Sequence, residues 1–252
     1  MTFDDLQLNG RVAVVTGGSR GIGASISRQL AAQGACVTIN YNASGEQAEA
    51  LVKEIEARGG KAVAVQGDVR KPEDAERIVE TTVSAFDKID ILVNNAGFNR
   101  DTLLLRMSLQ DWDEVMDLNL RAVFLCTKAA VRPMMKNRWG RIINIGSVSG
   151  LAGNAGQANY AAAKSGLIGF TRAVAREFGS RNITSNLVAP GLVITELTKD
   201  IRPEIVAGVK QRLLIDRNGT PEDVSAMVVY LASEEAGYVT GQVLSVDGGL
   251  GL

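Results

Sequence analysis

Residues 12–23 read Val12-Ala-Val-Val-Thr16-Gly17-Gly18-Ser19-Arg20-Gly21-Ile22-Gly23. A short apolar run passes directly into spaced glycines and then into a segment with helical periodicity. Glycines permit a tight turn and close approach of the backbone to a phosphate, and a helix N-terminus attracts anions through its free N–H groups and its dipole. A glycine cluster alone is a weak signal. Between a first strand and a first helix it predicts a site for the pyrophosphate of a dinucleotide, although the spacing Gly-x-x-x-Gly-x-Gly has a wider first gap than the common fingerprint.

The same alternation of strand and helix continues outward from this stretch. Continuously apolar runs rich in Val and Ile are typical of parallel strands buried on both faces, and their alternation with amphipathic segments indicates βαβ units. We therefore predict an α/β, Rossmann-type single domain over residues 1–252, with a doubly wound, seven-stranded parallel sheet flanked by helices on both faces. The expected strands are 12–16, 36–40, 62–66, 89–93, 141–145, 184–189 and 243–246. The expected helices are 22–33, 46–58, 72–86, 109–137, 160–179 and 221–233, with a shorter one at 203–211.

One long segment, 192–218, fits this alternation poorly. It follows a predicted strand, and loops in that position border the ligand crevice of open α/β sheets. We expect residues 192–218 to form a substrate lid.

The end of the second predicted strand bears on which dinucleotide is bound. The sequence there, Ile39-Asn40-Tyr41-Asn42-Ala43-Ser44, holds no carboxylate before Glu46. An acid about 20 residues after the glycine loop would bind the ribose hydroxyls and favour NAD. Arg20 instead places a cation inside the loop, which suits the 2′-phosphate of NADP(H), although it could also be a solvated loop residue. We predict NADP(H).

Tyr160 and Lys164 lie four residues apart at the start of a predicted helix, and so on one helical face. A nearby ammonium favours phenolate and would lower the tyrosine pKa from about 10, which makes Tyr160 a candidate acid or base. The chain has no histidine, so the commonest acid–base side chain is missing. An isolated pair of this kind is more often an ordinary surface pair, and the surrounding motifs must decide.

The composition excludes several other classes of function. The 252 residues hold 27 basic and 28 acidic side chains without blocks of one sign, which argues against nucleic-acid binding. No apolar run approaches the ~18 residues of a membrane span, and the first residues resemble no signal peptide. No Cys or His pattern indicates a metal. We expect a cytoplasmic protein with no membrane span and no metal site.

Taken together, the motifs resemble the classical short-chain dehydrogenase/reductase family over essentially the whole chain. The stretch 16–23 is similar to the family's cofactor loop, Asn94-Asn95-Ala96-Gly97 to its NNAG motif, and Pro190-Gly191 with Thr195 to its nicotinamide segment. The resemblance implies a catalytic tetrad of Asn119, Ser147, Tyr160 and Lys164. It implies that Ser147 binds the carbonyl oxygen, Tyr160 gives the proton, Lys164 assists it, and Asn119 holds a water of the proton relay. Ser149 is the alternative hydroxyl.

The resemblance also implies a set of cofactor-binding residues. They are Gly17, Ser19, Arg20, Gly21, Ile22, Gly23, Asn40, Asp68, Val69, Asn95, Ala96, Gly97, Tyr160, Lys164, Pro190, Gly191 and Thr195. Asp68, taken alone, would more often be a turn residue.

Within the family, the sequence is most similar to the 3-oxoacyl-acyl-carrier-protein reductases. That resemblance implies NADPH-dependent reduction of a 3-oxoacyl thioester, linked to acyl carrier protein or CoA, in fatty-acid or related synthesis. It also implies a homotetramer, with Arg138 and Arg181 receiving the acidic carrier protein beside the active-site entrance. Ser185 and Ile194 depart from the subgroup, which usually has an apolar and often an acidic residue there. The alternatives are a reductase or dehydrogenase of another ketone or secondary alcohol, such as a sugar or polyketide, and a non-catalytic nucleotide-binding scaffold.

Overall fold

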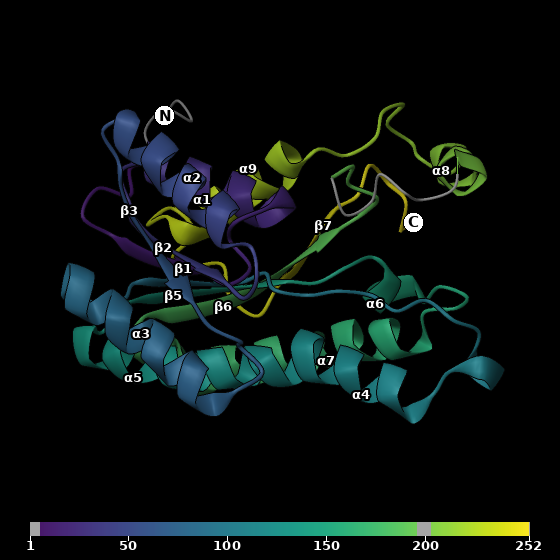
Figure 1. The fold of residues 1–252 in the computed structure, drawn as a ribbon, viewed down its shortest axis with the longest axis horizontal. Coiled ribbons are helices and arrows are strands. Elements are labelled where there is room, and N and C mark those ends of the chain that lie inside the picture. Colours follow the sequence, from purple (N-terminus) through teal and green to yellow (C-terminus); the bar gives the residue numbers. More distant parts are fainter. Residues whose placement is uncertain (1–5, 196–202, 252) are drawn as a thin grey trace.

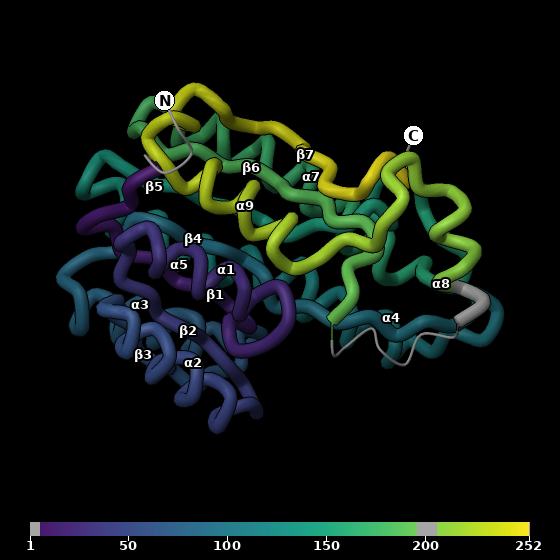
Figure 2. The backbone as a smooth tube through the Cα atoms, turned by 90° about the horizontal axis from the view of Figure 1, so that it is seen from above, coloured from purple at the N-terminus to yellow at the C-terminus, as the bar shows by residue number. Residues whose placement is uncertain are grey.

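The computed structural model of the protein describes residues 6–195 and 203–251, and its central feature is a seven-stranded parallel sheet. The strand order is β3-β2-β1-β4-β5-β6-β7, so the chain moves to one edge through β2 and β3 and then crosses to β4 on the other side of β1 (Figure 2). The predicted doubly wound sheet is confirmed. The strands are β1 Val12–Val15, β2 Cys36–Tyr41, β3 Lys61–Gln66, β4 Ile91–Asn94, β5 Gly140–Ile145, β6 Ile183–Pro190 and β7 Val243–Val246.

Helices cover both faces of this sheet (Figure 1). Helices α1, α2 and α9 pack on one face, and α3, α5 and α7 pack on the other, with α4 beside α7. Their bounds are α1 Gly21–Ala32, α2 Gly45–Ala57, α3 Pro72–Phe86, α4 Leu109–Met116, α5 Ala122–Asn137, α6 Ser149–Ala152, α7 Ala158–Phe178, α8 Pro203–Lys210 and α9 Pro221–Ala232. Short 3-10 turns occupy Leu104–Arg106 and Gly179–Arg181. No helix in these described ranges is both long and apolar enough to cross a bilayer.

The continuous apolarity of the strands has a direct structural cause. Along β1, Ala13 and Val15 point into the core beneath α1 and α9, whereas Val14 points into the core beneath α3 and α5. Successive side chains of a strand face opposite sides, so a sheet covered on both faces needs an apolar residue at every position.

Local sequence signals set several of the element ends. Thr220 and Asp223 form a reciprocal capping box at the start of α9, and Pro221 occupies the first helical position. Gly34, just after α1, takes a left-handed conformation with φ +92°, which a side chain would disfavour. These local signals explain why most predicted ends agree with the observed ones to within a residue or two.

The predicted helix 109–137 is interrupted, and this prediction needs correction. A π-helical segment, Asp117–Arg121, separates α4 from α5. The Asn119 side chain donates to the Val115 carbonyl at 2.9 Å, which is the acceptor that the Asn119 backbone N–H would use in an α-helix. A side chain that occupies this acceptor widens the turn locally.

The predicted lid is described at 192–195 and 203–218, which include α8, whereas residues 196–202 lie outside the described residues. Leu192–Ile194 is joined to Gly219 by backbone hydrogen bonds of 3.2 Å in both directions. On the far side of the segment, the Leu214 and Ile215 N–H groups donate to the Gly248 carbonyl at 2.9 and 3.2 Å. The lid therefore stays a prediction, as does the single domain over residues 1–252.

Candidate active site

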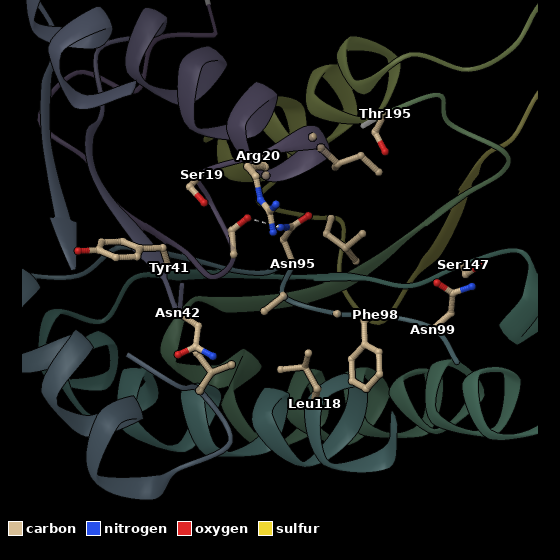
Figure 3. Close-up of a pocket in the computed structure, with 18 of the residues that line it drawn as sticks. Ser19, Arg20, Tyr41, Asn42, Asn95, Phe98, Asn99, Leu118, Ser147 and Thr195 are labelled. Carbon is tan, nitrogen blue, oxygen red and sulfur yellow. Dashed lines mark hydrogen bonds between the residues drawn. The ribbon is translucent and has the colours of Figure 1, made fainter. Parts of the chain in front are cut away.

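A cavity of about 640 Å³ lies at the carboxyl ends of the strands, where the chain crosses from β1 to β4. Ligands of open α/β sheets bind at this position. All of the predicted cofactor residues line the cavity, and so does Ser147; Figure 3 shows part of its wall. Asn119 is the one predicted catalytic residue that is not in the wall.

The glycine loop is shaped to bring backbone close to backbone. Gly17 and Gly21 have φ of +60° and +51°, and a Cβ on Gly17 would lie 3.1 Å from the Ala96 Cα. A Cβ on Gly23 would overlap the Gly17 carbonyl and come within 2.5 Å of the Asn95 amide nitrogen. Arg20 precedes α1 without a side-chain cap, so the first N–H groups of that helix face the cavity side of the loop. These features fit a bound pyrophosphate.

Asn40, at the end of β2, holds the loop from behind. Its buried amide donates to the carbonyls of Val65 and Gly67 at 3.3 and 3.0 Å, and its oxygen accepts the Gly17 N–H at 3.3 Å. The amide is thus used within the protein. Asn40 positions the glycine loop rather than offering a free group to a ligand.

Three arginines line the cavity, and they differ in their partners. Arg70 forms an ion pair with Asp68 at 2.7 Å, and its hydrogen bond lowers the pKa of that carboxyl. Arg100 pairs with Asp111 and Glu114 at 3.5 and 3.0 Å. Arg20 is exposed and forms no ion pair with any carboxylate in the described part of the chain. Its guanidinium is therefore available to an anionic ligand.

Ser147 and Tyr160 meet at the other end of the cavity. Ser147 follows β5 and Gly146, and its hydroxyl lies near Tyr160 at the start of α7, where it acts to lower the pKa of that phenol. The alternative hydroxyl, Ser149, is turned away: it donates to the Gln157 side chain at 2.8 Å, while its backbone N–H donates to the Ser147 Oγ at 3.1 Å. The structure therefore favours Ser147 as the hydroxyl that faces a ligand.

The expected effect of Lys164 on Tyr160 is wrong in this structure. Burial raises the pKa of Tyr160 above its usual value of 10, and the nearby Ser147 hydroxyl offsets this rise only in part. The Lys164 Nζ lies 5.6 Å from the ring centroid, over the ring face, and donates to the Ile145 carbonyl at 2.8 Å. The i, i+4 spacing does place Tyr160 and Lys164 on one face of α7, but the Lys164 ammonium is directed to the Tyr160 ring and the Ile145 carbonyl.

Lys164 is itself unusual, because it is almost fully buried at 4% exposure. Burial lowers its pKa to about 8. Gly97 lies opposite: a Cβ there would come within 3.4 Å of the Lys164 Nζ and 2.6 Å of the Asn119 Oδ1. The Asn119 amide nitrogen is anchored to the Phe98 and Val115 carbonyls at 2.8 and 2.9 Å, and its oxygen is buried without a partner among the described residues. That oxygen and Lys164 thus converge on Gly97.

Arg138 and Arg181 are not beside the entrance in this chain, and this expectation is corrected. Arg138 follows α5 and precedes β5, and Arg181 follows α7 and precedes β6. Both therefore lie at the amino ends of strands, whereas the cavity lies at the carboxyl ends. The two are close to each other, because Arg138 donates to the Ser180 carbonyl at 3.4 Å.

Two further groups of residues were not predicted from the sequence. The cavity wall includes Phe98, Leu118 and residues 41–44 at the end of β2 (Figure 3). Asn159, next to Tyr160, is completely buried and donates to the carbonyls of Arg100 and Asp111 at 3.3 and 3.1 Å. A rule that follows each strand for four residues past its end would have found Phe98 and residues 42–44, but nothing local marks Leu118 or Asn159.

Comparisons with known proteins agree with this geometry. A family model described as enoyl-(acyl carrier protein) reductase matches residues 17–251. The 3-oxoacyl-[acyl-carrier-protein] reductase of Synechocystis is 50% identical over 96% of this chain and 98% of its own, and that of Aquifex aeolicus is 46% identical over 98% and 99%. Among solved structures, a dehydrogenase/reductase from Sinorhizobium meliloti has a TM-score of 0.93 at 39% identity, with 99% and 98% of the two chains covered. A short-chain dehydrogenase/reductase variant from Serratia marcescens has a TM-score of 0.92 at 42% identity, with 97% and 99% covered.

Proposed function

Because the chain belongs to the short-chain dehydrogenase/reductase family, we propose that it is an oxidoreductase that reduces the ketone of 3-oxoacyl-acyl-carrier-protein with NADPH. The product is the 3-hydroxyacyl thioester of fatty-acid synthesis. The observation that carries the proposal is the meeting of Ser147, Tyr160 and Lys164 at one end of a cavity whose other end is the glycine loop. The relatives that share almost the full length of the chain carry this activity in their names.

In this proposal, the chemistry at the ketone is divided between two hydroxyl groups. NADPH, when bound, supplies the hydride that reduces the carbonyl carbon. The Ser147 hydroxyl donates a hydrogen bond to the carbonyl oxygen as negative charge develops there. The Tyr160 hydroxyl then gives its proton to that oxygen, and its raised pKa keeps it protonated at neutral pH.

Lys164 and Asn119 act behind Tyr160. Lys164, with a pKa of about 8, is charged at pH 7 yet able to lose a proton, which suits a relay that reprotonates Tyr160. The unpartnered Asn119 oxygen provides an acceptor for a water in that relay. Lys164, which lines the cavity, would also hold the ribose next to the nicotinamide.

The preference for NADPH over NADH rests on Arg20. The wall beyond β2 contains Asn42 and Ser44 but no carboxylate that would repel a 2′-phosphate. Arg20→Ala should raise the Michaelis constant for NADPH and leave that for NADH almost unchanged. Arg28→Ala, which removes a charge from α1 outside the cavity, is the matched control. Equal effects of Arg20→Ala on both cofactors would refute the assignment.

The carrier protein and the assembly belong to the same proposal. Arg138 and Arg181 can serve an entrance only if a second copy of the chain brings them to it, so we propose that they act on a neighbour's site within a homotetramer. Exposed Leu109 and Phe124 on α4 and α5 support such a contact. Reversing both arginines to Glu should reduce turnover of a carrier-linked substrate and spare a CoA thioester, with light scattering to show that the assembly is intact. Equal loss on both substrates would contradict the role.

A cytoplasmic location completes the proposal. The two cysteines, half-buried Cys36 and buried Cys126, are both free thiols. Free thiols persist in reducing compartments. Fractionation of cells that express the tagged chain tests this, and enrichment outside the cytoplasm would contradict it.

A substrate panel is the test of the whole proposal. Oxidation of NADPH should be fastest with acetoacetyl-carrier protein, slower with acetoacetyl-CoA, and slowest with small ketones or sugars. One observation favours another ketone. The exposed Ile194 lies between the cavity-lining residues Val193 and Thr195, at a position where the 3-oxoacyl-acyl-carrier-protein reductases often have an acidic residue. Faster turnover of a sugar or polyketide ketone would shift the assignment to that class, and no turnover of any carbonyl would indicate a scaffold.

A further inference from the structure

The first turn of α7, which carries Tyr160 as its third residue, lacks the usual side-chain cap. The first N–H groups of a helix have no acceptor within the helix, and a side chain at the N-cap ordinarily accepts one of them. Gln157 holds the N-cap position here, but its side chain forms no such bond. The Gln157 amide donates to the Asp101 carboxylate at 2.9 Å, and its oxygen accepts from the Ser149 Oγ at 2.8 Å. The Tyr160 N–H therefore needs another acceptor.

Asn159 supplies that acceptor. Its side-chain oxygen accepts the Tyr160 N–H at 2.8 Å. Its amide nitrogen donates to the Arg100 and Asp111 carbonyls at 3.3 and 3.1 Å. The residue is completely buried, and both polar atoms of its side chain have partners. A buried amide held at both ends has little freedom to turn, because another orientation would leave its donors or its acceptor unpaired.

The two carbonyls that Asn159 binds belong to residues that are themselves fixed. Arg100 forms ion pairs with Asp111 and Glu114 at 3.5 and 3.0 Å. Asp111 in turn forms a reciprocal capping box with Ser108 at the start of α4. Arg100 lines the cavity, whereas Asn159 does not. Asn159 thus joins the first turn of α7 to the cavity wall from behind.

We infer that Asn159 is a positioning residue for the reaction: it fixes the backbone of Tyr160 against the segment after β4 and so sets the place of the phenol hydroxyl. This inference rests on the proposed role of Tyr160 as proton donor. The hydroxyl is the far end of a long side chain, so a small turn of the backbone is enlarged there. Lys164, one turn further along α7, is held separately by its bond of 2.8 Å to the Ile145 carbonyl. Loss of the Asn159 amide should therefore disturb proton transfer more than cofactor binding.

The first test is Asn159→Ala, which removes the acceptor and both donors. Turnover of acetoacetyl-CoA with NADPH should fall roughly 10- to 10²-fold, the range for a catalytic group displaced by about 1 Å. The dissociation constant for NADPH, from fluorescence titration, should change by less than about threefold, because an effect confined to the chemical step appears in kcat.

Asn186→Ala is the matched control. Its completely buried amide lies within β6, outside the cavity wall, and also joins backbone groups. It donates to the Val239 carbonyl at 2.7 Å and accepts the Gln242 N–H at 3.1 Å. Asn186→Ala should lower stability in urea unfolding, as Asn159→Ala does, but leave turnover unchanged.

A double-mutant cycle with Tyr160→Phe tests whether the effect passes through the phenol. In the Tyr160→Phe background, Asn159→Ala should cost almost no further turnover, because no hydroxyl is left to position. Equal losses in both backgrounds would show a general structural role and overturn the inference. Wild-type turnover in Asn159→Ala, or an equal loss in Asn186→Ala, would overturn it as well.

Two further variants keep the outcome decisive. Asn159→Ser retains an acceptor for the Tyr160 N–H but is too short to reach both carbonyls, so it should lose less turnover than Asn159→Ala. It takes the place of Asn159→Ala in the cycle if that variant does not fold. Tyr160→Phe alone separates this inference from the proposed function. Near-normal turnover of Tyr160→Phe would remove the proton-donor role and the inference with it, whereas a large loss there beside wild-type turnover in Asn159→Ala would overturn the inference alone.

Discussion

Gly97 offers a sharp test of how the proton route is built. It precedes Phe98 in the segment after β4, and it faces the Asn119 oxygen and the Lys164 ammonium. A Cβ at this position would lie 2.6 Å from Asn119 Oδ1, where an ordinary carbon–oxygen contact is about 3.3–3.6 Å. Gly97→Ala therefore requires Asn119 to retreat by roughly 0.7–1 Å. The φ of Gly97 is not positive, so the backbone conformation itself does not disfavour alanine.

Asn119 has little freedom to make this movement. Its amide nitrogen is held by the Phe98 and Val115 carbonyls, and the residue is completely buried. Loss of one of these bonds costs about 1 kcal/mol, so the free energy of unfolding should fall by about 1–2 kcal/mol. A displacement of about 1 Å in a catalytic arrangement can cost up to about 10²-fold in rate, and we expect turnover to fall by about 10- to 10²-fold.

The assay is steady-state NADPH oxidation with acetoacetyl-CoA, together with urea unfolding of the same samples. Gly169→Ala is the matched control, because a Cβ at that position on α7 has no neighbour within 4 Å. It should leave turnover unchanged and, as a glycine replaced within a helix, raise stability by up to about 1 kcal/mol.

A double-mutant cycle tests the cause. Asn119→Ala removes the atom with which the new methyl group collides, so Gly97→Ala should cost far less turnover in that background than in the wild type. Equal losses in both backgrounds would show that the effect does not pass through Asn119. Wild-type turnover in Gly97→Ala would refute the packing argument altogether.

Three other predictions follow from the described contacts. Tyr160→Phe should lower turnover at least about 10²-fold, while NADPH binding, measured by fluorescence titration, survives. The control Tyr238→Phe, at a fully exposed site, should change neither turnover nor binding. Near-normal turnover of Tyr160→Phe would contradict the proton-donor role. Ser185→Ala removes a buried hydroxyl without a partner in the described ranges and should stabilise the fold by about 1 kcal/mol in urea unfolding. Ser25→Ala breaks a buried hydrogen bond of 3.0 Å to Ser225 and should destabilise the fold. A loss of stability in both variants would show that Ser185 has a partner. For Lys164, burial holds the folded-state pKa at about 8 against 10.5 in the unfolded chain, so the unfolded chain binds more protons between these values and stability rises with pH there. Lys164→Met should therefore be more stable than the wild type at pH 7, and this advantage should shrink as the pH rises through about 8 toward 10.5; a gap that does not change with pH would show that the charge is not what burial penalises.

The strand–helix alternation predicted the architecture well, because its signals are local. Both ends of the last strand, 243–246, agree with the prediction, and the first helix begins and ends one residue before its predicted bounds. The fourth strand was predicted at 89–93 and lies at Ile91–Asn94. Ile89 is buried and apolar like a strand residue, but Asp90 next to it uses its carboxylate to accept the Val12 N–H at 2.9 Å before the ladder begins.

The candidate site was predicted as a set of residues and not as an arrangement. Every predicted cofactor residue lies in the wall of one cavity, because most of them lie at or just beyond the carboxyl ends of parallel strands, which share one edge of the sheet, while Tyr160 and Lys164 reach it from α7. Arg138 and Arg181 lie at the opposite edge of the sheet, since each shortly precedes a strand and the amino ends of the strands meet there. Their expected place beside the entrance came from the family resemblance alone.

The sequence by itself determined the order of strands and helices, the glycine loop and the identity of the residues that gather at the cavity. Periodicity, turn residues and strand ends are all encoded within a few neighbouring positions. Only the tertiary structure decided what each polar group faces: the π-helical turn of Asn119, the ring beneath the Lys164 ammonium, and the amides that hold Asp101. These contacts join residues as far apart as Asp101 and Gln157, and the burial and charge that set a pKa depend on such distant partners.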